Sequence, residues 1–448
     1  MKTFIVDDMN PEDVAMLQAL YSRSSSSVET HLDRVKQGGS SKFMERYVVS
    51  YGHKSIADCG ATTMFIEGVS LLAAKAIQDN PLYSGQETST RYIDMSRQPI
   101  IDPLNTPASR EIMERWMSFY TESQERVAAL VRKKHPRRDV DDEKTYESAV
   151  KARTFDIMRG FLPAGICTQL SWHTNLRQAT DNLVRLRSHP LVEVNEIGDA
   201  LAAQLHERYP ASGFDRYVAS VSGTADREDD DGREAWERAA GRLAAYTPGT
   251  TLCDDDPSCV ITPMTDYRMF ERFKSLLSDR PRGVRLPHAL SNLAQVRSCF
   301  TLDFGSFRDV QRHRAGICLM PLLDLFYGFE SWYLDQLSDL DDMSLYKQAS
   351  RLLDEQASRI RGLQATAEER QYFVALGYKV ATDLNYSLPA MIYLAEMRSA
   401  KTVHPTLRRR VRALGTQLKK QLPGVALHID RSDDDWTLRR GTQTITER

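Results

Sequence analysis

A polar loop in the first half of the chain carries the side chains that a phosphate-binding site needs. It reads S-G-Q-E-T-S-T-R-Y and runs from residue 84 to residue 92. Arg91 offers a planar guanidinium that matches phosphate oxygens in a bidentate manner, Ser89 offers a hydroxyl, and Gly85 allows a close backbone approach. Each charge-assisted hydrogen bond to a ligand is worth roughly 1.5–3 kcal/mol. A polar turn with a surface ion pair explains the same residues and is the simpler interpretation on physics alone.

A second cationic group lies in the other half of the chain, where Arg312, His313 and Arg314 end a predicted helix. Two arginines and a histidine at that position can hold an anion or a cofactor diphosphate, with the imidazole against a ring. Cations at a helix C-terminus also stabilise the helix dipole without any ligand. Both interpretations stay open from the residues alone.

The elements that must position these groups occur twice. An acidic stretch near the middle, D-R-E-D-D-D-G-R-E at 226–234, is typical of a solvated linker and separates two halves of similar length. Each half has a predicted strand, a glycine and a predicted helix, in that order. The first set is 61–67, Gly68 and 69–78, and the second is 297–304, Gly305 and 306–314.

Further short matches keep the same order in both halves. A histidine precedes each predicted strand, at His53 and at His288. Later come a Leu-Pro, an arginine and a His-Pro, and we expect each to correspond between the halves. They are Leu162-Pro163, Arg177 and His189-Pro190 in the first half, and Leu388-Pro389, Arg398 and His404-Pro405 in the second. Thr106 and Pro107 also predict the start of a long amphipathic helix that runs to Lys133.

Composition is that of an ordinary globular protein. The chain has 448 residues, 41% hydrophobic and 27% charged, with a formal net charge of -2, so neither nucleic acid nor an anionic membrane is expected as a partner. We find no secretion signal and no apolar run of about 20 residues, and we expect a cytoplasmic protein. None of the six cysteines forms a C-x-x-C pair, so we predict free thiols and no metal site.

The two polar groups together resemble one motif of the flavin-dependent thymidylate synthase (ThyX) family, R-H-R-x-x-S-x-x-x-x-S-x-R-Y. The first half matches its later part from Ser84, with Gln86 where the family usually has Asn. It has D-N-P at 79–81 in place of R-H-R. The second half keeps R-H-R at 312–314 and loses the later part, and Asp309 stands where the family often has glutamine. The chain therefore resembles two fused ThyX subunits that keep complementary parts of the motif.

The resemblance extends to flanking elements and implies roles for their residues. His53, Ser55 and Asp58 are similar to the family's H-x-S-x-x-E, and N-L-R at 175–177 with L-R at 186–187 is similar to its N-L-R…L-R helix. The implied FAD-binding residues are His53, Ser55, Asp58, Asn182, Arg312, His313 and Arg314. The implied substrate-binding residues are Ser84, Gln86, Glu87, Ser89, Arg91, Tyr92 and Arg187, and the implied catalytic residues are Arg91, Arg312 and His313.

The resemblance implies an α/β fold with two ThyX-like domains, each a small mixed sheet flanked by helices. We predict domains at 1–222 and 236–448, with an acidic linker at 223–235. The implied reaction methylates deoxyuridine monophosphate (dUMP) to dTMP, with FAD, methylenetetrahydrofolate as carbon donor and NADPH as reductant. A homodimer would reproduce the family's tetramer as a pseudo-tetramer. The alternatives are an inactive ThyX-like binding or scaffold protein and a flavoenzyme that modifies another pyrimidine nucleotide.

Overall fold

The structure is a computed structural model that describes residues 4–50, 53–214, 236, 239–241, 243, 245–246, 253–338 and 343–442. The chain forms two compact units, and each combines segments that are distant in the sequence. The first unit contains residues 1–69, 76–87 and 169–245, and the second contains 70–75, 88–168 and 246–448. The predicted linker at 223–235 lies outside the described residues, so the predicted domain boundaries stay a prediction.

The first unit begins with a group of helices. They are α1 (Pro11–Tyr21), α2 (Val28–Gly38), α3 (Ser41–Met44), the π-helix η1 (Glu45–Ser50) and α4 (Lys54–Ala57). Asn10 caps α1, because its side chain accepts a hydrogen bond from the Glu12 backbone N–H at 2.9 Å. Met16, Leu17 and Val35 form the small apolar core between α1 and α2.

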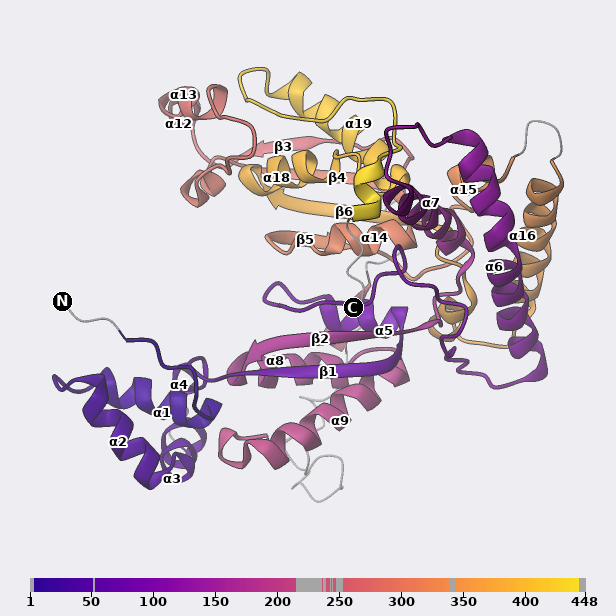
Figure 1. Cartoon of the computed structure of the whole chain (residues 1–448). Coiled ribbons are helices and arrows are strands. Elements are labelled where there is room, and N and C mark those ends of the chain that lie inside the picture. The colour runs from indigo at the N-terminus through magenta and orange to yellow at the C-terminus, as the bar shows by residue number, and fades with distance from the viewer. Residues whose placement is uncertain are drawn as a thin grey trace. The chain divides into compact units, whose positions relative to one another are not determined.

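The rest of the first unit is built on a strand pair. Strand β1 (Ala61–Ser70) pairs with β2 (Cys167–Asn175). Helices α8 (Leu176–Arg187) and α9 (Val192–Arg208) follow β2 and pack on each other, and the short helix η3 (Pro210–Ser212) ends this segment. Helix α5 (Leu71–Gln78) continues directly from β1, as Figure 1 shows.

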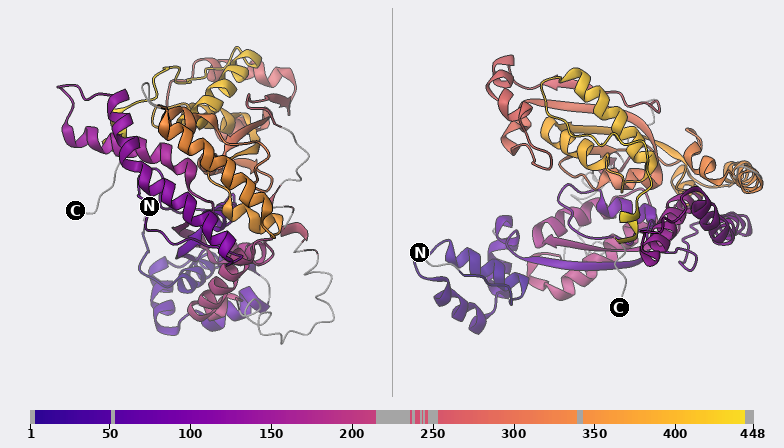
Figure 2. Two further views of the ribbon diagram at one scale, coloured as in Figure 1. Left: turned by 90° about the vertical axis from the view of Figure 1, so that its right-hand side faces the viewer. Right: turned by 45° about the horizontal axis from the view of Figure 1, so that its top comes forward.

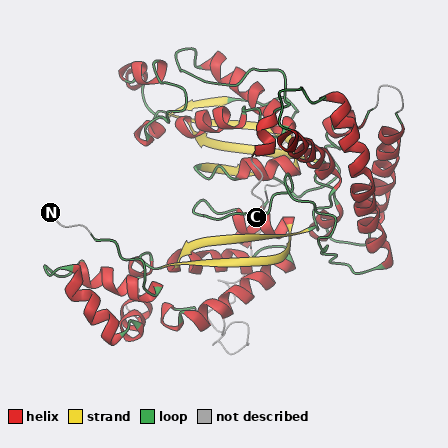
Figure 3. Cartoon of the chain, in the orientation of Figure 1, coloured by secondary structure: helices red, strands yellow, loops and turns green. Residues whose placement is uncertain are grey.

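The second unit contains a four-stranded antiparallel sheet in the order β3-β4-β6-β5 (Figure 3). Its strands are β3 (Val260–Pro263), β4 (Ala294–Asp303), β5 (Gly316–Leu319) and β6 (Lys379–Ser387). The register of the central pair is set by Gln295 opposite Ser387 and Asp303 opposite Lys379. Helices α14 (Phe304–Gln311), α18 (Leu388–Arg398) and α19 (Pro405–Gln421) all contact β4, so α/β architecture is confirmed.

Long helices complete the second unit. Helix α6 (Pro107–Lys134) starts at the Thr106 cap, as predicted, and packs on α7 (Glu143–Met158) and on α16 (Ser344–Gly362); α6 and α16 lie side by side in Figure 2. The shorter helices are η2 (Arg159–Phe161), α12 (Tyr267–Arg272), α13 (Lys274–Ser278), η4 (His288–Asn292), α15 (Ser331–Leu337), α17 (Ala367–Arg370), η5 (Gln371–Phe373) and η6 (Leu438–Thr442). Among the described helices, none is long and apolar enough to cross a membrane.

The predicted repeat is visible in the order and length of the elements. Strands β1 and β4 each have 10 residues and continue directly into α5 and α14, which each have 8. Later, η2 and η5 have 3 residues, β2 and β6 have 9, and α9 and α19 have 17. Strand β1 runs beyond its predicted end, so Gly68 lies inside β1. Strand β4 ends one residue before its predicted end, and Gly305 lies inside α14.

Two predicted matches between the halves are wrong. Arg177 is the second residue of α8, whereas Arg398 is the last residue of α18. Leu162-Pro163 precedes β2, whereas Leu388-Pro389 follows β6 and begins α18. The counterpart of Leu162 is instead Val374, because each residue follows a three-residue 3-10 helix at the same point of the repeat. Leu-Pro is a common helix-start pair, so its appearance in both halves was no sign of equivalence.

The equivalent segments pair with each other through reciprocal hydrogen bonds inside the second unit. Ala164 and Leu376 occupy equivalent positions, as do Gly165 and Gly377. The bonds run from Ala164 N to Val374 O (2.9 Å), Leu376 N to Leu162 O (2.8 Å), Gly165 N to Tyr372 O (2.8 Å) and Gly377 N to Gly160 O (2.8 Å). Each bond has a partner in which donor and acceptor exchange repeats, which is the pattern of a two-fold contact between identical subunits. We call this contact the repeat junction.

The expectation that all cysteines are free thiols is wrong for two of them. Cys253 and Cys299 form a disulfide with their Cα atoms 5.7 Å apart, within the range of protein disulfides. The bond ties the segment before β3 to the middle of β4. A separation of 46 residues hid this proximity from the sequence.

We expect Gly377→Ala to destabilise the repeat junction. A Cβ at this position would lie 2.3 Å from the Phe329 ring and 2.9 Å from the Gly160 carbonyl oxygen. Overpacking of this kind costs about 1–3 kcal/mol. Urea denaturation would measure the loss. The control is Gly362→Ala at the end of α16, where a Cβ meets nothing within 4 Å; equal stability of the two variants would contradict the expectation.

Candidate functional site

The start of the predicted phosphate loop is held against β2 in the first unit. The Ser171 and His173 backbone N–H groups donate to the carbonyl oxygens of Gln86 (2.8 Å) and Ser84 (2.7 Å). A Cβ at Gly85 would lie 1.9 Å from the Ser171 carbonyl oxygen, so this position requires glycine. The close approach that Gly85 allows is therefore to a neighbouring strand. Glu87 accepts a hydrogen bond from the Gln78 side-chain amide at 2.7 Å.

The residues that the resemblance assigns to FAD in the first half also lie in the first unit. His53 and Ser55 are exposed at α4. Asp58 accepts a hydrogen bond from Arg177 Nε at 2.6 Å, so the H-x-S-x-x-D element and the N-L-R helix contact each other. On that helix, Asn182 donates to the Gln178 carbonyl oxygen at 2.9 Å.

The predicted late arginine, Arg187, also lies in the first unit. Its Nε contacts Asp199 Oδ1 at 2.5 Å, which ties the end of α8 to α9. A Cβ at Gly198 would approach the Arg187 side chain to 2.9 Å, so a glycine keeps α9 close to this arginine.

Arg91 belongs to the second unit and is held by a buried carboxylate. Its Nε and Nη2 atoms donate to the two oxygens of Asp156 at 2.7 and 3.0 Å. Arg440 Nη2 donates to the same carboxylate at 3.0 Å, and its guanidinium lies 4.5 Å from the centroid of the Tyr92 ring. Burial raises the pKa of Asp156, but Arg440 and Arg91 outweigh burial and hold that pKa well below its usual range. Ser89 accepts a hydrogen bond from the Arg91 backbone N–H at 3.3 Å.

The R-H-R group lies at the end of α14, as predicted. Arg398 Nε donates to His313 Nε2 at 2.7 Å, so this nitrogen is an acceptor and the imidazole is neutral. Burial, with Arg398 and Arg314 nearby, lowers the pKa of His313 to about 3. The Tyr386 hydroxyl donates to the His313 carbonyl oxygen at 2.6 Å. The imidazole also contacts the Tyr393 ring edge-on, with centroids 5.9 Å apart.

The carboxylate of Asp309 interacts electrostatically with arginines of both motif fragments. Burial raises the pKa of Asp309, but Arg312, Arg159 and Arg91 together hold it well below its usual range. The Arg312 Nε lies 4.0 Å from Asp309 Oδ1, and Arg159 Nη1 lies 3.5 Å from Oδ2. The charge of Asp309 thus acts on Arg91 from the first half and on Arg312 from the second. Aspartate at this position supplies the anion that allows several guanidinium groups to share a small volume.

A network of buried polar side chains contacts Asp309 through Arg159. Arg159 Nη2 donates to Ser306 Oγ at 2.7 Å and lies 3.7 Å from Asp303 Oδ2. Asp303 also accepts hydrogen bonds from Tyr333 (2.8 Å) and Thr406 (2.5 Å). Burial raises the pKa of Asp303, although Arg159 opposes the shift. Partners from η2, α14, α15 and α19 therefore meet at a single carboxylate.

The donor set near His313 has the chemistry that a flavin dinucleotide requires. Arg312 and Arg314 offer guanidinium groups to a diphosphate, and Tyr393 offers an aromatic face. Arg285 already lies 4.0 Å from the Tyr393 ring centroid. A cavity of about 210 Å³ adjoins this ring, lined by the 282–286 loop and by apolar residues of α18. Within the described ranges, no three His, Cys, Asp or Glu side chains are arranged to hold a metal ion.

The sequence analysis missed the charged residues that organise the cluster. Asp156 and Arg159 stand one helical turn apart in F-D-I-M-R-G-F, at the end of α7, and are 3% and 1% exposed. Two opposite charges among apolar neighbours were a usable signal, because such charges stay buried only when they are paired. Arg440 gave no such signal, since it is distant in sequence from every partner.

The neutral state of His313 predicts a pH dependence of stability. The folded pKa of about 3 lies below the unfolded value of 6.5, so the unfolded chain binds the extra proton between these limits. This contribution to stability is complete above pH 6.5 and is lost as the pH falls toward 3, by up to about 1.4 kcal/mol per pH unit.

His313→Asn should therefore reduce the decrease in Tm between pH 6.5 and 4, measured by thermal unfolding at each pH. The control is His288→Asn, an exposed histidine of the same unit. If the His313→Asn variant and the parent show the same decrease in Tm, His313 is not held neutral in the folded protein.

Comparison with known proteins shows what the first half of the chain is similar to. Residues 4–211 match the family model described as thymidylate synthase complementing protein (Thy1). A crystal structure of thymidylate synthase X (ThyX) from Helicobacter pylori with FAD and dUMP aligns with 47% of this chain and 95% of that chain, at 20% identity. Its TM-score of 0.28 is too low to transfer any geometry.

Curated relatives extend along both halves of the chain. A UPF0159 protein of Chlamydia pneumoniae is 25% identical over 445 residues, covering 88% of this chain and 81% of that protein. A UPF0159 protein of Chlamydia muridarum is 26% identical over 421 residues, covering 82% and 76%. Their double length agrees with the repeat, and residues 4–211 of this chain are similar to the thymidylate synthase complementing protein (Thy1) family.

Proposed function

We propose that this protein is a flavin-dependent thymidylate synthase-like enzyme that methylates dUMP to dTMP. The observation that carries the proposal is that each half keeps a different part of the motif, with Arg91 in one half and Arg312 in the other. Both arginines act electrostatically on Asp309, and Arg312 Nε lies 4.0 Å from its Oδ1 atom. The proposed co-substrates are methylenetetrahydrofolate, as carbon donor, and NADPH, as reductant. The family match supports the nucleotide chemistry.

Each part of the cluster has a proposed role in this reaction. Arg91 and Ser89 would bind the nucleotide phosphate, with Tyr92 beside the sugar. Arg312 and Arg398 would stabilise negative charge that develops on the uracil ring. His313, which is neutral, would accept a hydrogen bond and keep Arg398 oriented. Bound FAD would carry the reducing equivalents, held by Arg312 and Arg314.

The remaining predicted site residues are part of the same proposal. Ser84, Gln86, Glu87 and Arg187 of the first unit stay candidates for nucleotide binding. His53, Ser55, Asp58 and Asn182, also in the first unit, stay candidates for flavin binding. The proposed assembly is a homodimer, in which four copies of the repeated fold form a pseudo-tetramer.

A second candidate is a ThyX-like binding or scaffold protein without turnover. The space enclosed around Arg91 and Asp156 has a volume of only about 10 Å³, which is room for about one water molecule. Asp156 also occupies the bidentate face of Arg91. A flavoenzyme that acts on another pyrimidine nucleotide uses the same groups and differs in the substrate that binds.

Arg91→Lys tests the phosphate role. Lysine keeps a positive charge beside Asp156, so the buried carboxylate stays paired, while the planar fork for phosphate is lost. We expect dUMP binding to weaken about ten- to a hundredfold, the equivalent of one charge-assisted contact, with FAD content unchanged. Calorimetric titration with dUMP and absorbance near 450 nm measure the two quantities.

The control for this variant is Arg97→Lys, which changes an exposed arginine six residues away. Arg312→Ala should give the opposite result and release FAD. If Arg91→Lys and Arg312→Ala both bind dUMP and FAD like the parent, the composite site is wrong and the scaffold protein is favoured.

The dimer is tested by light scattering. We expect a mass of twice the 50.9 kDa chain at micromolar concentration. A mass of one chain under these conditions would contradict the pseudo-tetramer.

A further inference from the structure

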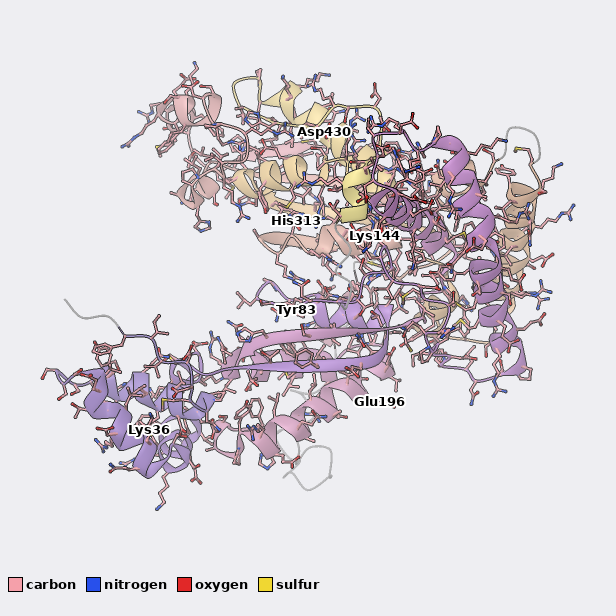
Figure 4. All side chains as sticks on the ribbon, viewed as in Figure 1. Lys36, Tyr83, Lys144, Glu196, His313 and Asp430 are labelled. Carbon is pink, nitrogen blue, oxygen red and sulfur yellow. A yellow bond between two sulfur atoms is a disulfide. The ribbon has the colours of Figure 1, made fainter. Side chains whose placement is uncertain are left out.

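The C-terminal segment from Asp430 to Thr442, which we call the strap, lies across a row of basic residues in the second unit. Figure 4 labels Asp430 at its start. Four of its carboxylates each meet a different cation. The pairs are Asp430 with Arg408 (3.5 Å), Asp433 with Arg412 (3.1 Å), Asp434 with Lys401 (3.6 Å) and Asp435 with Arg153 (3.0 Å).

The inner members of this basic row are buried by the strap. The Arg408 side chain is 3% exposed and donates to the strap carbonyl oxygens of Ser432 (2.6 Å) and Asp434 (3.2 Å). The Arg153 side chain is 7% exposed and donates to the Asp435 carbonyl oxygen at 2.8 Å. The outer pairs, at Asp433 and Asp434, are solvent-exposed and contribute little. Carboxylates and carbonyl oxygens of the strap thus take the positions of anionic oxygens over the buried arginines.

The end of the strap reaches the ion pair of Arg91 and Asp156. Trp436 stacks on His135 with ring centroids 4.5 Å apart and an interplanar angle of 3°. Arg440 then shares Asp156 with Arg91 and donates to the Tyr92 hydroxyl at 2.9 Å. Strap residues are part of the wall that reduces the space beside Arg91 to about 10 Å³.

Removal of the strap would leave a cationic surface with one buried acid. Arg91, Arg153, Lys401 and Arg408 would face solvent around Asp156, continuous with a hollow of about 390 Å³ lined by Arg409, Arg412 and Trp332. That density of guanidinium groups suits phosphate oxygens. A nucleotide needs a pocket of a few hundred Å³, so the strap and a nucleotide exclude each other here.

We propose that the basic row beneath the strap is a phosphate-binding groove, and that the strap is its internal competitor, displaced when a phosphate-bearing ligand binds. The inference rests on the proposed function only for the identity of the ligand as a nucleotide. Anion binding at the groove follows from the row of cations itself. A ligand binds only the molecules in which the strap is undocked. The apparent affinity is therefore the intrinsic affinity multiplied by the undocked fraction.

Two variants release the strap by different means. Arg440→Ala removes its contacts with Asp156 and Tyr92, while Arg91 still neutralises Asp156. Gly441→Ala changes no charge, but its Cβ would lie 2.1 Å from the Thr145 carbonyl oxygen of α7, so the end of the strap cannot dock. Arg439→Ala is the matched control, because Arg439 is the exposed neighbour of the buried Arg440.

The experiment titrates the full chain and each variant with dUMP and with inorganic pyrophosphate, and follows hydrogen exchange of residues 430–442. We expect both release variants to bind about tenfold or more tightly than the parent and the control. In the parent, either ligand should increase exchange in the strap.

Each other outcome has a separate meaning. Tighter binding of pyrophosphate but not of dUMP supports the groove and contradicts the nucleotide function. Parent-like binding in both release variants, or no binding of either ligand, overturns the groove. Weaker binding after Arg440→Ala also overturns it, because Arg440 would then be a ligand contact.

Discussion

The stability of the second unit depends on neutralisation of the buried positive charge of Arg159. This side chain is almost fully buried, and a buried guanidinium is tolerated only with anionic partners. Its partners, Asp303 and Asp309, come from the other repeat, at the end of β4 and within α14. Removal of one partner would leave an uncompensated buried charge, which typically costs about 3–5 kcal/mol. The contact of η2 with the end of β4 and with α14 follows from this requirement.

The same requirement explains why the halves can differ so much in sequence at their motif positions. A duplicated pair of identical subunits has two equivalent places for each fragment. Here the arginine of one fragment and the histidine of the other act on a common set of charges, so one copy of each is sufficient for one cluster. At the corresponding positions the halves carry Asp79-Asn80-Pro81 and apolar residues near Ile317. Ile317 lies in β5.

The elements with local signals could be predicted from the sequence. The Thr106-Pro107 helix start, the strand-to-helix passages of both halves and the position of R-H-R at a helix end are confirmed. Their causes are short-range: a capping hydroxyl, β-branched runs and helical periodicity. The Asp156–Arg440 contact, the Cys253–Cys299 bond and the true partner of Leu162 could not be predicted, because they arise from chain segments brought together only by the tertiary fold.

The repeat junction has a consequence for assembly by mass action. In an association of separate subunits, a two-fold contact forms only when the subunit concentration exceeds its dissociation constant. When both partners belong to one polypeptide, each experiences the other at an effective concentration set by the connecting chain, on the order of millimolar for short flexible connections. The reciprocal bonds between Ala164 and Val374 and between Leu376 and Leu162 should therefore persist on dilution. The contact should therefore be fully formed even in a cell that holds only a few molecules of this protein.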